Sequence, residues 1–165
     1  MARNNWRFAT VNDNLRRLLI SAHRMTNDIC AQCTPPFHCC NSVGAKACAY
    51  SVRIAKEEFG VSLYFPKLDL GEVILTSHGC PIPPEIRPSC SLYACQETVD
   101  RIATPEWKAT YLKLKETYTL LYLHKMWLRD GRAGSISLRW VSRSEIDKLI
   151  KGVDIVRKKL IVAEA

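Results

Sequence analysis

All eight cysteines of this 165-residue chain lie between residues 30 and 95, and they are the residues best suited to chemistry. They are Cys30, Cys33, Cys39, Cys40, Cys48, Cys80, Cys90 and Cys95. None falls in the three segments with the clearest apolar periodicity of a helix, where cysteines used as small apolar core residues would be scattered. Their neighbours are prolines and turn residues, so we interpret the set as metal ligands carried on loops.

The compartment decides between metal ligands and disulfides. The first ten residues contain no apolar core and no cleavage site of a signal peptide, so we expect a cytoplasmic protein whose thiols stay reduced. Adjacent Cys39 and Cys40 cannot easily bridge each other. In Cys30-x-x-Cys33, two intervening residues let both thiolates turn toward one ion. Metal binding is therefore favoured over four disulfides and over buried apolar thiols.

The spacing favours an iron–sulfur cluster slightly over zinc. A zinc ribbon would repeat the C-x-x-C knuckle, and this chain has one such pair. The other spacings are irregular, and Cys80 precedes Pro81, as the last cysteine precedes a proline in some ferredoxins. His38 and His78 lie beside or near cysteines and could complete a mixed site. A solvated loop histidine explains each of them equally well.

Two cysteine-bearing segments form a wider pattern. The first is Cys30-Ala-Gln-Cys33 followed by Cys39-Cys40, and the second runs from Gly79-Cys80-Pro81 through Arg87-Pro88-Ser89-Cys90 to Cys95. Together they resemble the YkgJ-type cysteine-cluster proteins, a zinc- or iron-chelating family, although five residues separate Cys33 from Cys39 where that family has two. The resemblance covers residues 30–95 and leaves Cys48 outside the pattern. It implies a metal centre held by Cys30, Cys33, Cys39, Cys40, Cys80, Cys90 and Cys95.

The formal net charge of +8 is spread unevenly over three regions. An N-terminal amphipathic helix region, 1–29, carries +3, the cysteine-cluster region, 30–100, carries −2, and a basic helical region, 101–165, carries +7. An acidic partner, either protein or nucleic acid, would therefore bind the basic flanks. A solvated helix face is the simpler explanation for most such charges. The candidate side chains for an acidic partner are Lys148, Lys151, Arg157, Lys158 and Lys159.

Three segments have the apolar spacing of amphipathic helices. The first is 13–26, with Asn12 or Asp13 as its N-cap. The second is 104–129, opened by Thr104-Pro105-Glu106, and the third is 144–160, opened by a capping-box-like Ser144 to Asp147. Their apolar stripes are Leu15, Leu18, Leu19, Ala22 and Met25; Trp107, Tyr111, Leu114, Tyr118 and Leu121; and Ile146, Leu149, Ile150, Val153, Val156 and Leu160.

The remaining segments add little regular structure. We expect a short helix over 51–59, short strands near 61–65, 73–75 and 136–140, and loops over 30–48 and 77–95. The sequence thus predicts a single compact domain that is mainly α, with a loop-rich, metal-stabilised cysteine cluster and at most a few short strands. No apolar run is long enough to cross a bilayer.

These features predict a metal-binding cysteine-cluster protein that serves electron transfer or metal handling. A structural zinc module of a basic nucleic-acid- or protein-binding protein is the first alternative. The second is a metalloenzyme of unknown reaction, which is disfavoured because the chain has no Gly-rich phosphate loop, no H-E-x-x-H and no nucleophile elbow. The oligomeric state is left open by the sequence.

Overall fold

The computed structural model describes residues 5–32, 84–86, 92, 94–130 and 141–164. This part of the chain is mainly helical and contains no strand, which confirms the predicted fold class. The predicted helix over 51–59 and the three predicted strands lie outside it, as do most of the two predicted loops. The helices are α1 (Asn5–Cys30), the 3-10 helix η1 (Pro84–Ile86), α5 (Gln96–Ile102), α6 (Pro105–Asp130) and α7 (Arg143–Glu164).

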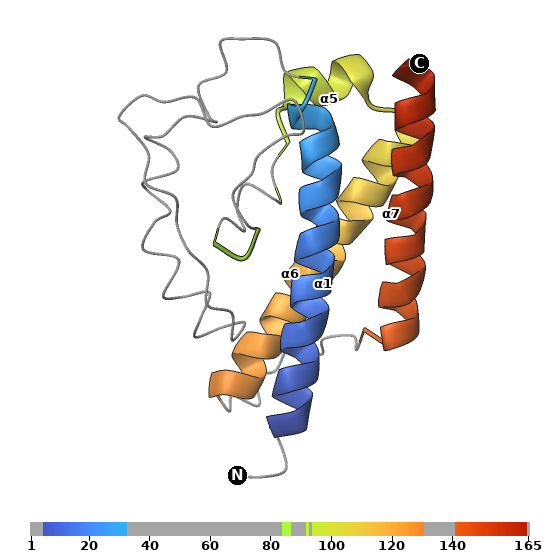
Figure 1. Ribbon diagram of the computed structural model, residues 1–165. Helices are drawn as coiled ribbons and strands as arrows, with labels where there is room; N and C mark the ends of the chain where they lie inside the picture. Colours follow the sequence, from blue (N-terminus) through green and yellow to red (C-terminus); the bar gives the residue numbers. More distant parts are fainter. Residues whose placement is uncertain (1–4, 33–83, 87–91, 93, 131–140, 165) are drawn as a thin grey trace, which may run out of the picture.

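Three long helices, α1, α6 and α7, pack side by side as a bundle (Figure 1). α1 and α7 run in the same direction. α6, which lies between them in the sequence, runs in the opposite direction. The short helix α5 lies at the end of the bundle where α1 and α7 end and α6 begins. Each long helix therefore presents one apolar stripe to the other two.

The core is the meeting point of the predicted stripes. Every stripe residue of α1 and α6 is buried, and so are those of α7 except Ile150, which is half-buried. Val11 and Ile29 extend the α1 stripe at both ends, and Val99 of α5 closes one end of the core. Because burial of one large aliphatic side chain stabilises the fold by about 1.5–3 kcal/mol, this continuous cluster accounts for the bundle.

The start of α6 agrees with the sequence prediction. The backbone N–H of Trp107 donates to the Thr104 hydroxyl over 3.1 Å, which is the hydrogen bond of an N-cap residue. The backbone N–H of Lys108 donates to the Thr104 carbonyl over 3.0 Å, which is the first helical hydrogen bond. Pro105 is then the first helical residue, where its missing N–H has no partner to lose.

The other two predicted helix starts were wrong. The backbone N–H of Glu145 donates to the Ser142 hydroxyl over 3.1 Å, so Ser142, not Ser144, caps α7. α1 already includes Asn5, which places Asn12 and Asp13 in its interior. The eight residues from Asn5 to Asn12 contain no proline or glycine that would stop the helix.

α5 was not predicted, and its seven residues form a separate helix between the last cysteine and the Thr104 cap. Among the described helices, none combines the length and the apolar character that a membrane span requires.

Candidate metal centre

Two of the predicted metal ligands, Cys30 and Cys95, lie in the described part of the chain. Cys30 is the last residue of α1, and Cys95 is the N-cap residue of α5. Both thiols are half-buried and neither forms a disulfide. Because α5 packs against α1, the first and the last cysteine of the sequence lie at the same end of the bundle (Figure 1).

Hydrogen bonds hold this end of the bundle together. The chain continues past Cys30 in a turn, in which the backbone N–H of Gln32 donates to the Ile29 carbonyl over 3.0 Å. The Gln32 carbonyl then accepts a hydrogen bond of 3.1 Å from the guanidinium of Arg101 in α5. The segment that leaves α1 toward the cysteine cluster is thus tied to the helix that follows the cluster.

The surroundings of Cys95 favour its thiolate. The backbone N–H and the hydroxyl of Thr98 lower the pKa of the Cys95 thiol, because both donors stabilise the negative sulfur. The thiolate is the form that ligates metals, and this environment therefore suits a ligand.

Cys30 lies beside a rigid aromatic group. The Tyr111 hydroxyl is 3.2 Å from the Thr26 hydroxyl, and the Tyr111 ring stacks on Trp107 with ring centroids 4.9 Å apart. Burial raises the pKa of Tyr111 to about 12, and the negative charge of a Cys30 thiolate adds to the increase. The Lys115 ammonium lies over the same ring, 5.5 Å from its centroid. A neutral, packed phenol therefore adjoins the Cys30 position.

The segment that precedes Cys95 is also anchored to the bundle. Glu85 of η1 is buried and accepts a hydrogen bond of 3.0 Å from the Arg16 guanidinium of α1. Further along, Leu92 and Ala94 pack against the apolar core. The described residues of this segment thus attach it to the bundle in two ways, through the Glu85 bond to Arg16 of α1 and through Leu92 and Ala94 at the apolar core.

The other predicted ligands lie outside the described residues. They are Cys33, Cys39, Cys40, Cys80 and Cys90, together with the less favoured His38, His78 and Cys48. Within the ranges that the structure describes, no three His, Cys, Asp or Glu side chains are grouped to hold a metal ion. The structure thus places two of the seven favoured ligands and leaves the geometry of the others a prediction.

The predicted basic residues of α7 differ in their surroundings. The side chains of Lys148, Lys151, Lys158 and Lys159 are exposed. Arg157 is half-buried instead and makes two hydrogen bonds to the Asp28 carboxylate of α1, over 2.7 and 3.2 Å. This guanidinium links two helices, so of the five predicted residues the four lysines are the exposed cations.

Comparisons of the chain with protein-family models, with curated proteins and with solved structures find no match. The resemblance to the YkgJ-type cysteine-cluster proteins therefore stays a prediction that depends on the cysteine-bearing segments of residues 30–95.

Proposed function

We propose that this protein binds a metal centre through its cysteines at the bundle end where α1 stops and α5 begins. The observation that carries the proposal is the placement of Cys30 and Cys95, two free thiols from opposite ends of the cysteine-bearing segment, on neighbouring helix termini. Both thiols are only half-buried, and the Thr98 donors favour the thiolate of Cys95.

Sequence separation brings two more cysteines within reach of this position. Cys33 lies three residues after Cys30. Cys90 lies five residues before Cys95 and two residues before Leu92, which is also described. Because one residue extends a chain by at most about 3.6 Å, both stay within roughly 20 Å of a described thiol even in a fully extended chain. Four thiolates would fill the coordination shell of a tetrahedral zinc ion or hold an iron–sulfur cluster. These four cysteines are our preferred ligands.

An electron-transfer or metal-handling accessory is the role we favour, with an iron–sulfur cluster slightly ahead of zinc. The α1, α6 and α7 bundle has its own apolar core, so a metal is not needed to hold these helices together. This favours a metal centre with a functional role over a zinc ion that only stabilises the fold. A cytoplasmic location belongs to the same proposal, because thiols stay reduced there.

Metal analysis of anaerobically purified protein tests this function. We expect iron with acid-labile sulfide and a visible absorption band that bleaches on reduction, or zinc without colour. Cys30→Ser and Cys95→Ser should each lower the metal content at least about tenfold, since loss of one thiolate opens the coordination shell. Cys48→Ser, a matched change outside the preferred set, should leave it unchanged. Neither metal in the wild type, or full metal in both variants, would refute the proposal.

A second, separate function is binding of an acidic partner by the basic C-terminal region. Four lysines of α7 are exposed, and residues 101–165 carry a formal charge of +7. Such a surface attracts acidic proteins or nucleic acids at a rate that falls as ionic strength rises.

A further inference from the structure

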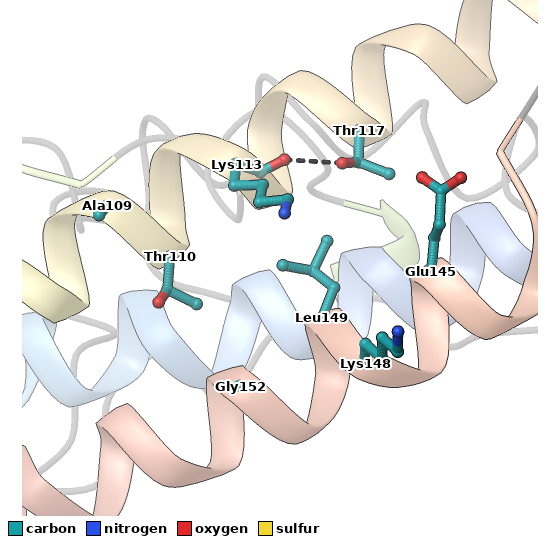
Figure 2. Close-up of a pocket in the computed structure, with 8 residues that line it drawn as sticks. All are labelled: Ala109, Thr110, Lys113, Thr117, Glu145, Lys148, Leu149 and Gly152. Atoms are coloured by element: carbon teal, nitrogen blue, oxygen red, sulfur yellow. Dashed lines mark hydrogen bonds between the residues drawn. The ribbon is translucent and has the colours of Figure 1, made fainter. Parts of the chain in front are cut away.

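A groove of about 670 Å³ lies between α6 and α7 and opens to solvent (Figure 2). α1 lies behind these two helices in the same view, so the groove is on the side of the bundle that α1 does not cover. Its walls are Ala109, Thr110, Lys113 and Thr117 of α6 and Glu145, Lys148, Leu149 and Gly152 of α7. Of these polar residues, Lys148 is the one that the charge pattern of the sequence predicted to bind an acidic partner.

The groove has a cation on each wall. Lys113 comes from α6 and Lys148 from α7, both are exposed, and neither ammonium forms an ion pair within the part of the chain that the structure describes. Figure 2 shows the Lys113 ammonium directed into the space between the helices. The Thr117 hydroxyl donates to the Lys113 carbonyl over 2.8 Å, so it is engaged within α6. With the single carboxylate of Glu145, the lining is net positive.

Gly152 leaves the α7 side of the groove open. A Cβ atom at this position would meet nothing within 4 Å, so packing inside the bundle does not require glycine there. Glycine in a helix interior costs about 1 kcal/mol relative to alanine. Lys148, Gly152, Ile155 and Lys159 recur at intervals of four, three and four residues, which places them on one edge of α7. Ile155 is 55% exposed, so this edge offers two cations and an apolar contact.

We infer that this groove binds an acidic amphipathic helix of a partner protein. Sites for small molecules enclose most of their ligand, whereas this groove is open and is lined by two helices, as in helix-in-groove recognition. Residues 109–117 of α6 rise about 12 Å, which matches roughly two turns of a bound helix. Leu149 lines the groove but is only 8% exposed, so most of the apolar contact would come from Ile155 beside the groove. The carboxylates of the bound helix would meet Lys113 and Lys148.

A nucleic acid fits the groove less well. Binding along a phosphate backbone depends on many cationic contacts in a row, whereas two lysines and the Glu145 carboxylate line this groove. The inference rests on the acidic-partner function proposed above and is independent of the metal centre. Metal content measured on the same samples therefore separates a failure of this inference from a failure of the metal proposal.

Fluorescence anisotropy with three labelled synthetic peptides tests the inference. The peptides are helical, about 18 residues long and identical in their leucine positions, with Glu, Gln or Lys on the polar face. The Glu peptide should bind at least about tenfold more tightly than the Gln peptide, and the Lys peptide most weakly. The double variant Lys113→Glu/Lys148→Glu should weaken binding of the Glu peptide at least about tenfold. Gly152→Trp, which fills the groove and keeps its charge, should do the same.

Lys158→Glu is the charge control, because it makes at one exposed residue outside the groove the change that the double variant makes at two. It should alter binding less than about twofold, with helix content unchanged by circular dichroism in every variant. Equal binding of the Glu and Gln peptides would overturn the inference. Equal weakening of Glu-peptide binding by Lys158→Glu would also overturn it. So would displacement of the Glu peptide by a single-stranded RNA whose own affinity falls equally in all three variants.

Discussion

The phenol of Tyr111 lies between the apolar core and the end of α1 that carries Cys30. Its pKa is raised to about 12 from an ordinary value of 10.0, chiefly by burial. The folded protein therefore holds this proton more tightly than the unfolded chain does. The resulting contribution to stability is complete below pH 10 and is lost as the pH rises toward 12.

We therefore expect one of the six tyrosines to ionise near pH 12 in an alkaline absorbance titration of the folded protein. The free energy of unfolding should fall between pH 10 and 12, as measured by urea denaturation. Tyr111→Phe should remove the late titration and flatten this fall. At neutral pH it should cost about 1 kcal/mol, because the buried hydrogen bond between the Tyr111 and Thr26 hydroxyls is lost. An unchanged alkaline titration in Tyr111→Phe would contradict the assignment.

The ion pair between Arg16 and Glu85 joins a buried carboxylate to a half-exposed cation. Glu85 is 6% exposed, whereas the Arg16 side chain is 41% exposed. Arg16→Ala leaves the carboxylate buried without its cation, so we expect a loss of about 1–2 kcal/mol of unfolding free energy in urea. This is less than for a fully buried pair, because solvent screens Arg16. Arg24→Ala, at an exposed site on the same helix, should change the unfolding free energy by less than about 0.5 kcal/mol. If Arg16→Ala and Arg24→Ala lowered the unfolding free energy equally, Arg16 would not hold η1.

Single residues also show what local sequence can predict. The cap at Thr104 was predicted because its proline and acidic neighbours act within one turn of helix. The Ser142 cap was missed although Ser142 and Glu145 match the capping-box sequence better than Ser144 and Asp147, which have the same spacing but Asp in place of Glu. In both cases the decisive hydrogen bond spans three residues, so the information was present in the sequence.

At the scale of elements, two ion pairs align α1 with α7. Arg17 bonds Asp147 over 2.6 Å, and Asp28 bonds Arg157 over 2.7 Å, with sequence separations of 130 and 129 residues. The nearly constant separation is what two helices running in the same direction produce. α1 supplies the cation of one pair and the anion of the other. If α7 ran in the opposite direction, like charges would meet at both positions, so the charge pattern favours the observed orientation.

The two pairs should differ in strength because they differ in exposure. The Asp28 and Arg157 side chains are 15% and 26% exposed and share two hydrogen bonds, whereas Asp147 is 46% exposed. In double-mutant cycles with alanine, measured by urea denaturation, we expect a coupling energy of about 1–2 kcal/mol for Asp28 and Arg157. The Arg17 and Asp147 coupling should be clearly smaller and should vanish first with added salt. Equal couplings would contradict this ranking.

Apolar periodicity explains why the long helices were predictable and their arrangement was not. A stripe with a period of 3.6 residues identifies a helix and its buried face, and the stripes of α1, α6 and α7 were identified correctly. It does not specify which helices are neighbours, because that depends on contacts such as the one between Asp28 and Arg157. α5 has seven residues, too few for periodicity to appear, so its packing beside Cys30 could not be predicted.

For the whole molecule, the described core consists of helical residues and Val141. Every member of the apolar cluster belongs to α1, α5, α6 or α7, apart from that one residue. The bundle therefore has hydrophobic burial of its own. By contrast, residues 30–48 have few large apolar side chains beyond Phe37 and Val43, and prolines are frequent in residues 77–95. The two parts of the chain should depend on a metal to different degrees.

Removal of the metal should therefore loosen residues 30–95 first and leave most of the helix content in place. Ordering a chain costs roughly 1–2 kcal/mol per residue in backbone entropy, and a structural zinc ion contributes on the order of 10 kcal/mol at neutral pH. Hydrogen exchange with mass spectrometry on chelator-treated, reduced protein should show faster exchange across 30–95 and retained protection in the interior of α1, α6 and α7. Far-ultraviolet circular dichroism should change little. Unchanged exchange across 30–95 would mean that this segment keeps its structure without metal. Loss of protection in all three helices would mean that the bundle itself depends on the metal.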